Sequence, residues 1–274
     1  IIPAIFWEQT GLTAWDVTGP ELTVPGAYHY LRQALKTQSP RAVFIEISAV
    51  LYPRHTNFTK AVIGQMPWGR DRVEMILKEA EPENRPGLIF PLYFYHSRWS
   101  ELEADDVRVF LKGFEKDMAA GYTYLNQYRV PGGYVERTDS GMDRENNARN
   151  LQYLLKIAQL CREEGITPVF YESPAASTMP RSLMDPVYEA LRAIEGAVVV
   201  NFNDHREAIG AELQGDYYDN LHYNARGAEK FSRFLGTWVL EHLELTPCGR
   251  ADESLWQQRA EYIHKLLEQP MTAA

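Results

Sequence analysis

The side chains best suited to chemistry gather at residues 216–227, where two acids and a histidine precede a helix start. Asn224 is a good helix N-cap, because its side-chain oxygen accepts from an unpaired backbone N–H. The apolar residues that follow recur at helical spacing, at Phe231, Phe234, Leu235, Trp238 and Val239. His222 is therefore expected on a loop directly before a buried helix, with Asp219 three residues upstream. A rigid scaffold behind such a loop can present a histidine for catalysis.

An aspartate and a histidine in this arrangement can form a general base and its orienting group. The histidine takes the proton of an attacking hydroxyl, and the aspartate holds the imidazole tautomer. Two other interpretations stay open: Asp219 as a turn residue beside an exposed His222, or Asp216, Asp219 and His222 as cation ligands. No second cluster is spaced to complete a metal shell. We therefore expect no metal, and no cofactor either, since the sequence contains no phosphate-cradling glycine loop, Cys-x-x-Cys or His-Glu-x-x-His.

Composition is that of a soluble globular protein. The chain has 274 residues and a formal net charge of −9, which argues against nucleic acid or an anionic membrane surface as the main partner. No stretch of 18 apolar residues is present, so no transmembrane helix is expected within these residues. Cys161 lies on the apolar face of a predicted helix and should pack as a small hydrophobe. A disulfide with Cys248 stays open.

Segments with strand and helix periodicity alternate along the chain. Strands are predicted at 13–18, 41–49, 167–171 and 197–202. Helices are predicted from Pro25, at 70–80, 107–114, 143–164, 182–194 and 252–267, and after Asn224. This alternation is typical of an α/β fold with a mainly parallel sheet. We expect one domain at 1–245, with an irregular excursion at about 119–141, and a C-terminal turn and helix at 246–274 packed on it.

Polar side chains follow several of the predicted strands. Ser48, Ser173, Asn203 and the Asp219–His222 loop all come after strand segments, so they are expected beyond the carboxyl edge of the sheet, where α/β proteins bind ligands. Glu46 lies inside an apolar strand, so it should lean toward an edge or a polar pocket, or be paired.

Four pieces of the sequence, in order, resemble a known superfamily. They are residues 3–11, residues 27–46, His96-Ser97-Arg98-Trp99, and Asp219-Asn220-Leu221-His222 followed by Asn224 and Gly227. Together they look like the SGNH (GDSL-type) hydrolases. The resemblance is to the extracytoplasmic branch that includes teichoic-acid D-alanyl transfer proteins and polysaccharide O-acetyltransferases or esterases.

The resemblance implies a three-layer α/β/α sandwich and a serine-type esterase or acyltransferase acting on O-acyl groups of cell-surface carbohydrate or a related polymer. It implies His222 as the base, oriented by Asp219, and Gly19 as an oxyanion donor. Ser48 stands where the family often has an asparagine donor. His96, Arg98 and Trp99 would bind a sugar or an anionic acyl donor, or else pack as an aromatic segment. A membrane-bound acyl-donor partner and an anchored, extracytoplasmic location are implied, with a cytoplasmic location as the alternative.

The sequence departs from the family at the nucleophile. In these hydrolases the serine ends the first, central strand, and no Gly-Asp-Ser-type turn is present here. We therefore expect the serine upstream of Ile1, and a sheet that lacks its first strand and leaves backbone groups unpaired. The alternative is a non-catalytic SGNH-like protein that binds carbohydrate or assembles the cell envelope. Ser173 lacks the glycines of a nucleophile elbow. The histidines outside the two motifs are expected to be structural or exposed: His29, His55, His205, His242 and His264.

Overall fold

The computed structural model describes residues 1–90, 103, 116–138, 144–247 and 252–273. Its helices are α1 (Pro3–Thr10), α2 (Val24–Ala34), α3 (Thr59–Gln65), α4 (Arg70–Glu79), α5 (Arg85–Ile89), α8 (Arg144–Glu163), α9 (Arg181–Arg192), α10 (Arg206–Ile209), α11 (Ala225–His242) and α12 (Glu253–Leu267). Its strands are β1 (Ala42–Glu46), β2 (Gln127–Tyr128), β3 (Val135–Glu136), β4 (Thr167–Glu172), β5 (Ser177–Thr178), β6 (Val198–Asn201) and β7 (Thr272–Ala273). The expected α/β class is confirmed.

The main sheet has three strands in the order β1-β4-β6, and both pairs are parallel. In its register Ile45 lies beside Phe170, and Phe170 lies beside Val199. Two small parallel pairs, β2 with β7 and β3 with β5, lie outside this sheet. The carboxyl ends of β1, β4 and β6 therefore meet at one edge, as the alternation of strands and helices predicts.

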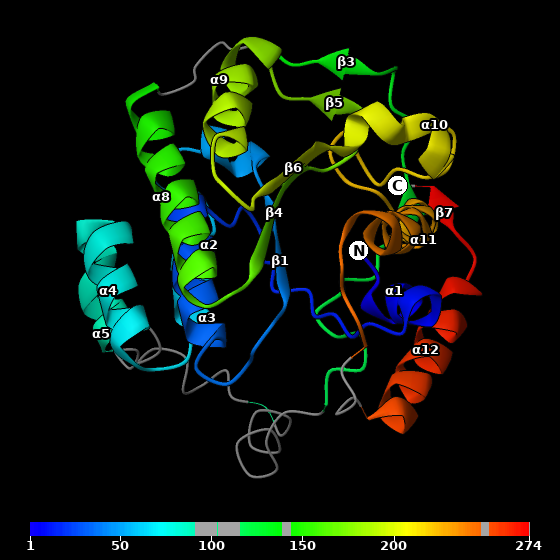
Figure 1. Ribbon diagram of the computed structural model, residues 1–274, viewed down its shortest axis with the longest axis horizontal. Helices are drawn as coiled ribbons and strands as arrows, with labels where there is room; N and C mark the ends of the chain where they lie inside the picture. The colour runs from blue at the N-terminus through cyan, green and yellow to red at the C-terminus, as the bar shows by residue number, and fades with distance from the viewer. Residues whose placement is uncertain (91–102, 104–115, 139–143, 248–251, 274) are drawn as a thin grey trace.

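Helices cover both faces of this sheet (Figure 1). Side chains of a strand alternate between its two faces, and here each face meets its own hydrophobic cluster. Phe170 and Ile45 pack with side chains of α2, α8 and α9, whereas Val169 and Phe44 pack with side chains of α1 and α11. The resulting three layers match the expected α/β/α arrangement.

One edge of β1 has no partner strand among the described residues. Thr167 donates its N–H to the Arg41 carbonyl, and Ile47 donates to the Tyr171 carbonyl, so alternate residues of β1 bond to β4. The N–H and C=O groups of Ala42, Phe44 and Glu46 point the other way, because successive residues of a strand face opposite sides of its ladder. β1 is thus an edge strand of the described sheet, as is β6, and the strand missing beside it stays a prediction.

The prediction of a strand at 13–18 is wrong. Residues 12–19 form neither a helix nor a strand, and the Asp16 N–H donates to the Ala120 carbonyl rather than to a neighbouring strand. A strand needs a neighbour that supplies a ladder of hydrogen bonds, and no described strand lies beside this segment. Trp15 and Val17 are about half exposed on it.

Helix α1 was not predicted from the sequence. It is the N-terminal helix, and it packs against the C-terminal helix α12. Its Ile5 packs with Ala260 and Ile263 of α12, so the C-terminal helix lies against the same body as residues 1–245.

Cys161 is buried, as predicted. Other predictions fall outside the described residues: His96, Arg98, Trp99, the helix at 107–114 and Cys248. In the part of the chain that the structure describes, no helix combines the length and apolarity needed to span a membrane.

Candidate functional site

Asp219 and His222 form a hydrogen-bonded pair. The His222 Nδ1 atom lies 2.9 Å from Oδ1 and 2.9 Å from Oδ2 of Asp219. A carboxylate on Nδ1 selects the tautomer with the proton on that atom, which leaves Nε2 as an acceptor. The His222 side chain is 64% exposed, so Nε2 can accept a proton from a group outside the loop.

The loop that carries the pair closes on itself. The Asp219 Oδ1 atom also accepts from the backbone N–H groups of Leu221 and His222, at 2.7 and 2.8 Å. The Tyr218 N–H donates to the His222 carbonyl, and Tyr217 forms an antiparallel bridge with Tyr223. These bonds hold the carboxylate and the imidazole in one turn, so their alignment does not depend on side-chain contacts from elsewhere.

Asn224 connects this turn to α11. Its Oδ1 accepts from the N–H groups of Arg226 and Gly227, as predicted for an N-cap, while its Nδ2 donates to the Gly215 carbonyl at 2.7 Å. Only glycine fits at position 227, because there is no room for a side chain. A Cβ there would lie 2.2 Å from the Asp216 carbonyl oxygen and 2.6 Å from the Tyr223 ring. The helix start can approach the loop this closely only at a residue without a side chain.

Asp216 is a structural anchor of the loop. It is fully buried, and its Oδ2 accepts from Lys230 Nζ and from the Glu212 N–H, both at 2.7 Å. It therefore fixes α11 to the chain before the loop, and its charge is compensated by Lys230. The loop is also tied to β5, since the Ser177 N–H donates to the Asn220 carbonyl. The loop therefore contacts the segment that follows β4 in the chain.

The charge of Asp219 follows from its surroundings. Partial burial alone would raise the pKa of Asp219, but the hydrogen bonds from the His222 ring and from the Leu221 and His222 N–H groups outweigh it, so the pKa is lowered. The carboxylate is ionised at neutral pH, which is the form that stabilises a protonated imidazole.

A second polar group lies at the end of β1. The Glu46 Oε1 atom accepts from Ser48 Oγ at 2.6 Å and from the Ser173 N–H at 3.2 Å, and Oε2 accepts from the Ser48 N–H at 3.0 Å. The pKa of Glu46 is raised to about 7, mainly by burial and in smaller part by the nearby Glu172, against the lowering effect of these bonds. Both donors of Ser48 are engaged by Glu46, so Ser48 can serve an oxyanion only if Glu46 releases them.

The ends of β4 and β6 are joined by Asn203. Its Nδ2 donates to the Ser173 carbonyl at 3.0 Å, and its Oδ1 accepts from the Ala175 N–H at 3.0 Å. The buried Glu172 accepts from Tyr188 Oη at 2.8 Å, and its pKa is raised by burial. The sequence therefore places Ser48, Ser173 and Asn203 correctly at one edge, where they form a hydrogen-bonded network.

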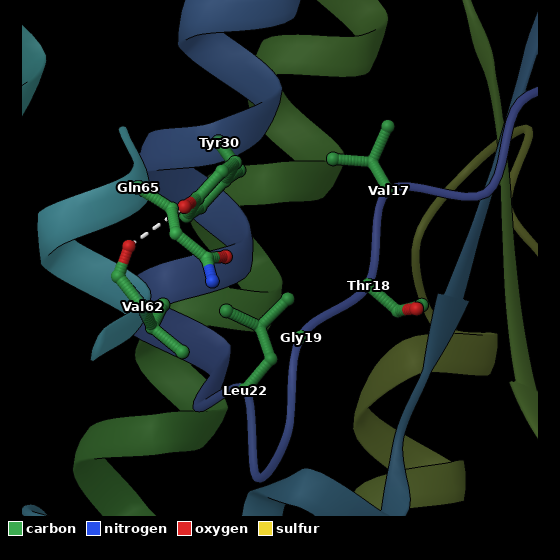
Figure 2. Close-up of a pocket in the computed structure, with 7 residues that line it drawn as sticks. All are labelled: Val17, Thr18, Gly19, Leu22, Tyr30, Val62 and Gln65. Atoms are coloured by element: carbon green, nitrogen blue, oxygen red, sulfur yellow. Dashed lines mark hydrogen bonds between the residues drawn. The ribbon is translucent and has the colours of Figure 1, made fainter. Parts of the chain in front are cut away.

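Gly19, the other predicted oxyanion donor, lies in a turn whose carbonyl accepts from the Leu22 N–H. It lines a cavity of about 200 Å³ between the extended chain at 17–19 and side chains of α2 and α3 (Figure 2). Tyr30, in this wall, donates its hydroxyl to the Val62 carbonyl at 2.7 Å. None of the hydrogen bonds and ion pairs of the described residues joins Gly19 or Ser48 to the Asp219–His222 pair.

Comparison with known proteins does not assign the chain to a family. No family model matches the chain, and neither a curated protein nor a solved structure matches it. The chemistry of the site therefore depends on the residues themselves.

Proposed function

We propose that this chain belongs to a serine-type esterase or acyltransferase that acts on O-acyl groups of cell-surface carbohydrate or a related polymer, outside the cytoplasm. His222 is the general base, and Asp219 orients it. The observation that carries the proposal is the contact of His222 Nδ1 with both Asp219 carboxylate oxygens at 2.9 Å, which leaves Nε2 open. The order of motifs in the sequence supports the class of substrate.

In the proposed reaction His222 Nε2 accepts the proton of a serine hydroxyl as the serine Oγ attacks the acyl carbon. The tetrahedral intermediate collapses, and the leaving alcohol takes the proton from the imidazolium. Water, or a sugar hydroxyl, then gives its proton to Nε2 as its oxygen attacks the acyl carbon. The second tetrahedral intermediate collapses with cleavage of the bond to the serine Oγ, which takes the proton back from the imidazolium. Asp219 stays ionised throughout and stabilises the charged imidazole.

The serine of this proposal lies outside residues 1–274, on a strand that pairs with the outer edge of β1. The support is the outer edge of β1, where the backbone groups of Ala42, Phe44 and Glu46 face away from β4 and no described strand pairs with them, because an added strand would do so. Such a strand would end at the edge of the sheet where the polar network and the His222 loop follow their strands. A glycine-serine turn there would present its hydroxyl beyond the sheet.

A fluorophosphonate probe, which labels activated serines, tests the proposal on the protein that the complete gene encodes. The expected result is one labelled serine outside residues 1–274, with labelling and p-nitrophenyl acetate turnover lost in His222→Ala. The matched control is His264→Ala, because His264 is also an exposed histidine on a carboxylate, with Nε2 at 2.9 Å from Glu8. Labelling that survives His222→Ala, or no labelling at all, would refute the catalytic role.

The second candidate is a non-catalytic protein of the same fold that binds carbohydrate or assembles the cell envelope. The observation that favours it is the 64% exposure of His222, which is high for a base that must exclude water. No labelled serine, together with saturable polysaccharide binding that His222→Ala leaves unchanged, would support this candidate over the enzyme.

A further inference from the structure

A second group of potential ligands lies between α2 and α4, away from the loop of His222. His29 on α2 and Asp71 and Glu74 on α4 each offer a ligand atom, and these atoms lie within 4.8 Å of one another. His29 and Asp71 are buried, while Glu74 is partly exposed. Two ligands of one zinc ion are at most about 4 Å apart, since the ligand bonds are about 2.0–2.2 Å long. Shifts of less than about 1 Å would bring these atoms to one ion.

His29 is the observation that points to a ligand. Its side chain is fully buried, yet neither Nδ1 nor Nε2 has a hydrogen-bond partner among the described residues. The Asp71 Oδ1 atom, in the same cluster, is held by the Arg32 guanidinium, with Nε at 3.0 Å. Buried polar atoms are almost always satisfied, because an unpaired one loses its hydrogen bonds to water and gains none in return. Two unpartnered ring nitrogens on a fully buried histidine, beside two carboxylates, indicate a group that binds there.

The charges around the cluster allow a cation to enter. Asp71 pairs with Lys36 Nζ at 2.6 Å and with Arg32 Nε at 3.0 Å, and Glu74 pairs with Lys78 Nζ at 2.7 Å and with Arg32 Nη1 at 2.8 Å. The two lysine side chains are about half exposed, so they can turn into solvent at little cost. Exchange of two lysine charges for one divalent ion leaves the local formal charge unchanged.

We propose that His29, Asp71 and Glu74 form a site for a divalent transition-metal ion of the zinc class, with water completing the shell and Lys36 as the competing cation. One imidazole and two carboxylates suit Zn²⁺, whereas Mg²⁺ and Ca²⁺ prefer oxygen ligands alone. The ion would cross-link α2 to α4, and so stabilise the packing of the helices on one face of the sheet. From the sequence, His29 was expected to be structural or exposed, and a role as a metal ligand goes beyond that expectation.

Zinc titration of the purified protein against a competing chromophoric chelator measures the affinity, and thermal unfolding measures the stabilisation. We expect about one tight Zn²⁺ equivalent, a raised Tm, and no effect of Mg²⁺. His29→Gln should weaken binding by more than about 10-fold, since even substitutions behind the ligands cost that much. Lys36→Gln should tighten binding, because it removes the competing charge. His264→Gln is the matched control and should bind like the wild type.

Glu74→Gln provides a second test if His29→Gln fails to fold, because Glu74 is partly exposed and its loss leaves the helix surface intact. It should also weaken Zn²⁺ binding and change the visible absorption of the Co²⁺-substituted protein. Equal Zn²⁺ affinity in wild type and Glu74→Gln, or weaker binding in Lys36→Gln, would overturn the proposal. A solved structure with Zn²⁺ present and only water beside His29 would do the same.

Discussion

The buried carboxyl of Glu46 gives the sharpest test of the polar network at the edge of the sheet. Burial raises the pKa of Glu46 from 4.5 to about 7, and the hydrogen bonds from Ser48 and Ser173 counteract this only in part. Each pKa unit corresponds to about 1.4 kcal/mol. The ionised carboxyl therefore costs the folded state about 3 kcal/mol relative to the unfolded chain, where water solvates it.

The direction of the pH dependence follows from proton binding. Between pH 4.5 and 7 the folded protein holds the Glu46 proton and the unfolded chain has lost it, so the free energy of unfolding falls as pH rises. The stability is fully present below the unfolded pKa and is lost as pH rises through the folded pKa. Glu46→Gln cannot ionise, so it should escape this loss.

Urea unfolding at pH 4.5 and pH 8.5 measures the effect. The difference in stability between wild type and Glu46→Gln should shift by about 3 kcal/mol between the two pH values, in favour of the variant at high pH. The substitution can also destabilise the protein by an amount that does not depend on pH, for example because its amide group faces the Ser48 N–H. This amount is the same at both pH values, so it cancels in the comparison. Glu195→Gln, at an exposed site, is the control and should shift by less than about 0.5 kcal/mol. A pH-independent difference for Glu46→Gln would refute the reasoning.

Three further substitutions test the scaffold of the His222 loop and the core beneath it, all by urea unfolding. Gly227→Ala should cost more than about 2 kcal/mol, because its Cβ would lie 2.2 Å from the Asp216 carbonyl, whereas Gly64→Ala, with open space around it, should be neutral or slightly stabilising. Asn224→Ala should cost about 1–2 kcal/mol through the lost N-cap, and Asn224→Asp should cost at least as much, because its buried carboxylate would face the Gly215 carbonyl; a loss below about 0.5 kcal/mol for Asn224→Ala would contradict the capping role. Phe202→Ala should cost about 3–5 kcal/mol, because the ring is fully buried among aromatic neighbours, and a loss below about 1 kcal/mol would contradict this packing.

Much of the fold was predictable because it depends on local patterns. Apolar spacing identified α2, α4, α8, α9, α11 and α12, and apolar runs identified β1, β4 and β6. The strand predicted at 13–18 failed because strand formation needs a partner elsewhere in the chain. Helix α1 was missed because the four residues of its first turn, Pro3, Ala4, Ile5 and Phe6, are all buried. A turn that is buried on all sides shows no amphipathic period.

The sequence by itself determined the Asp219–His222 pair, since residues three apart in one turn meet through local hydrogen bonds. Only the tertiary structure decided which distant groups meet. Glu46 reaches the Ser173 N–H across 127 residues because β1 and β4 are neighbours. His29 faces Asp71 and Glu74 because α2 packs on α4. Sheet order and helix packing minimise exposed apolar area over the whole chain, so no local window of sequence contains them.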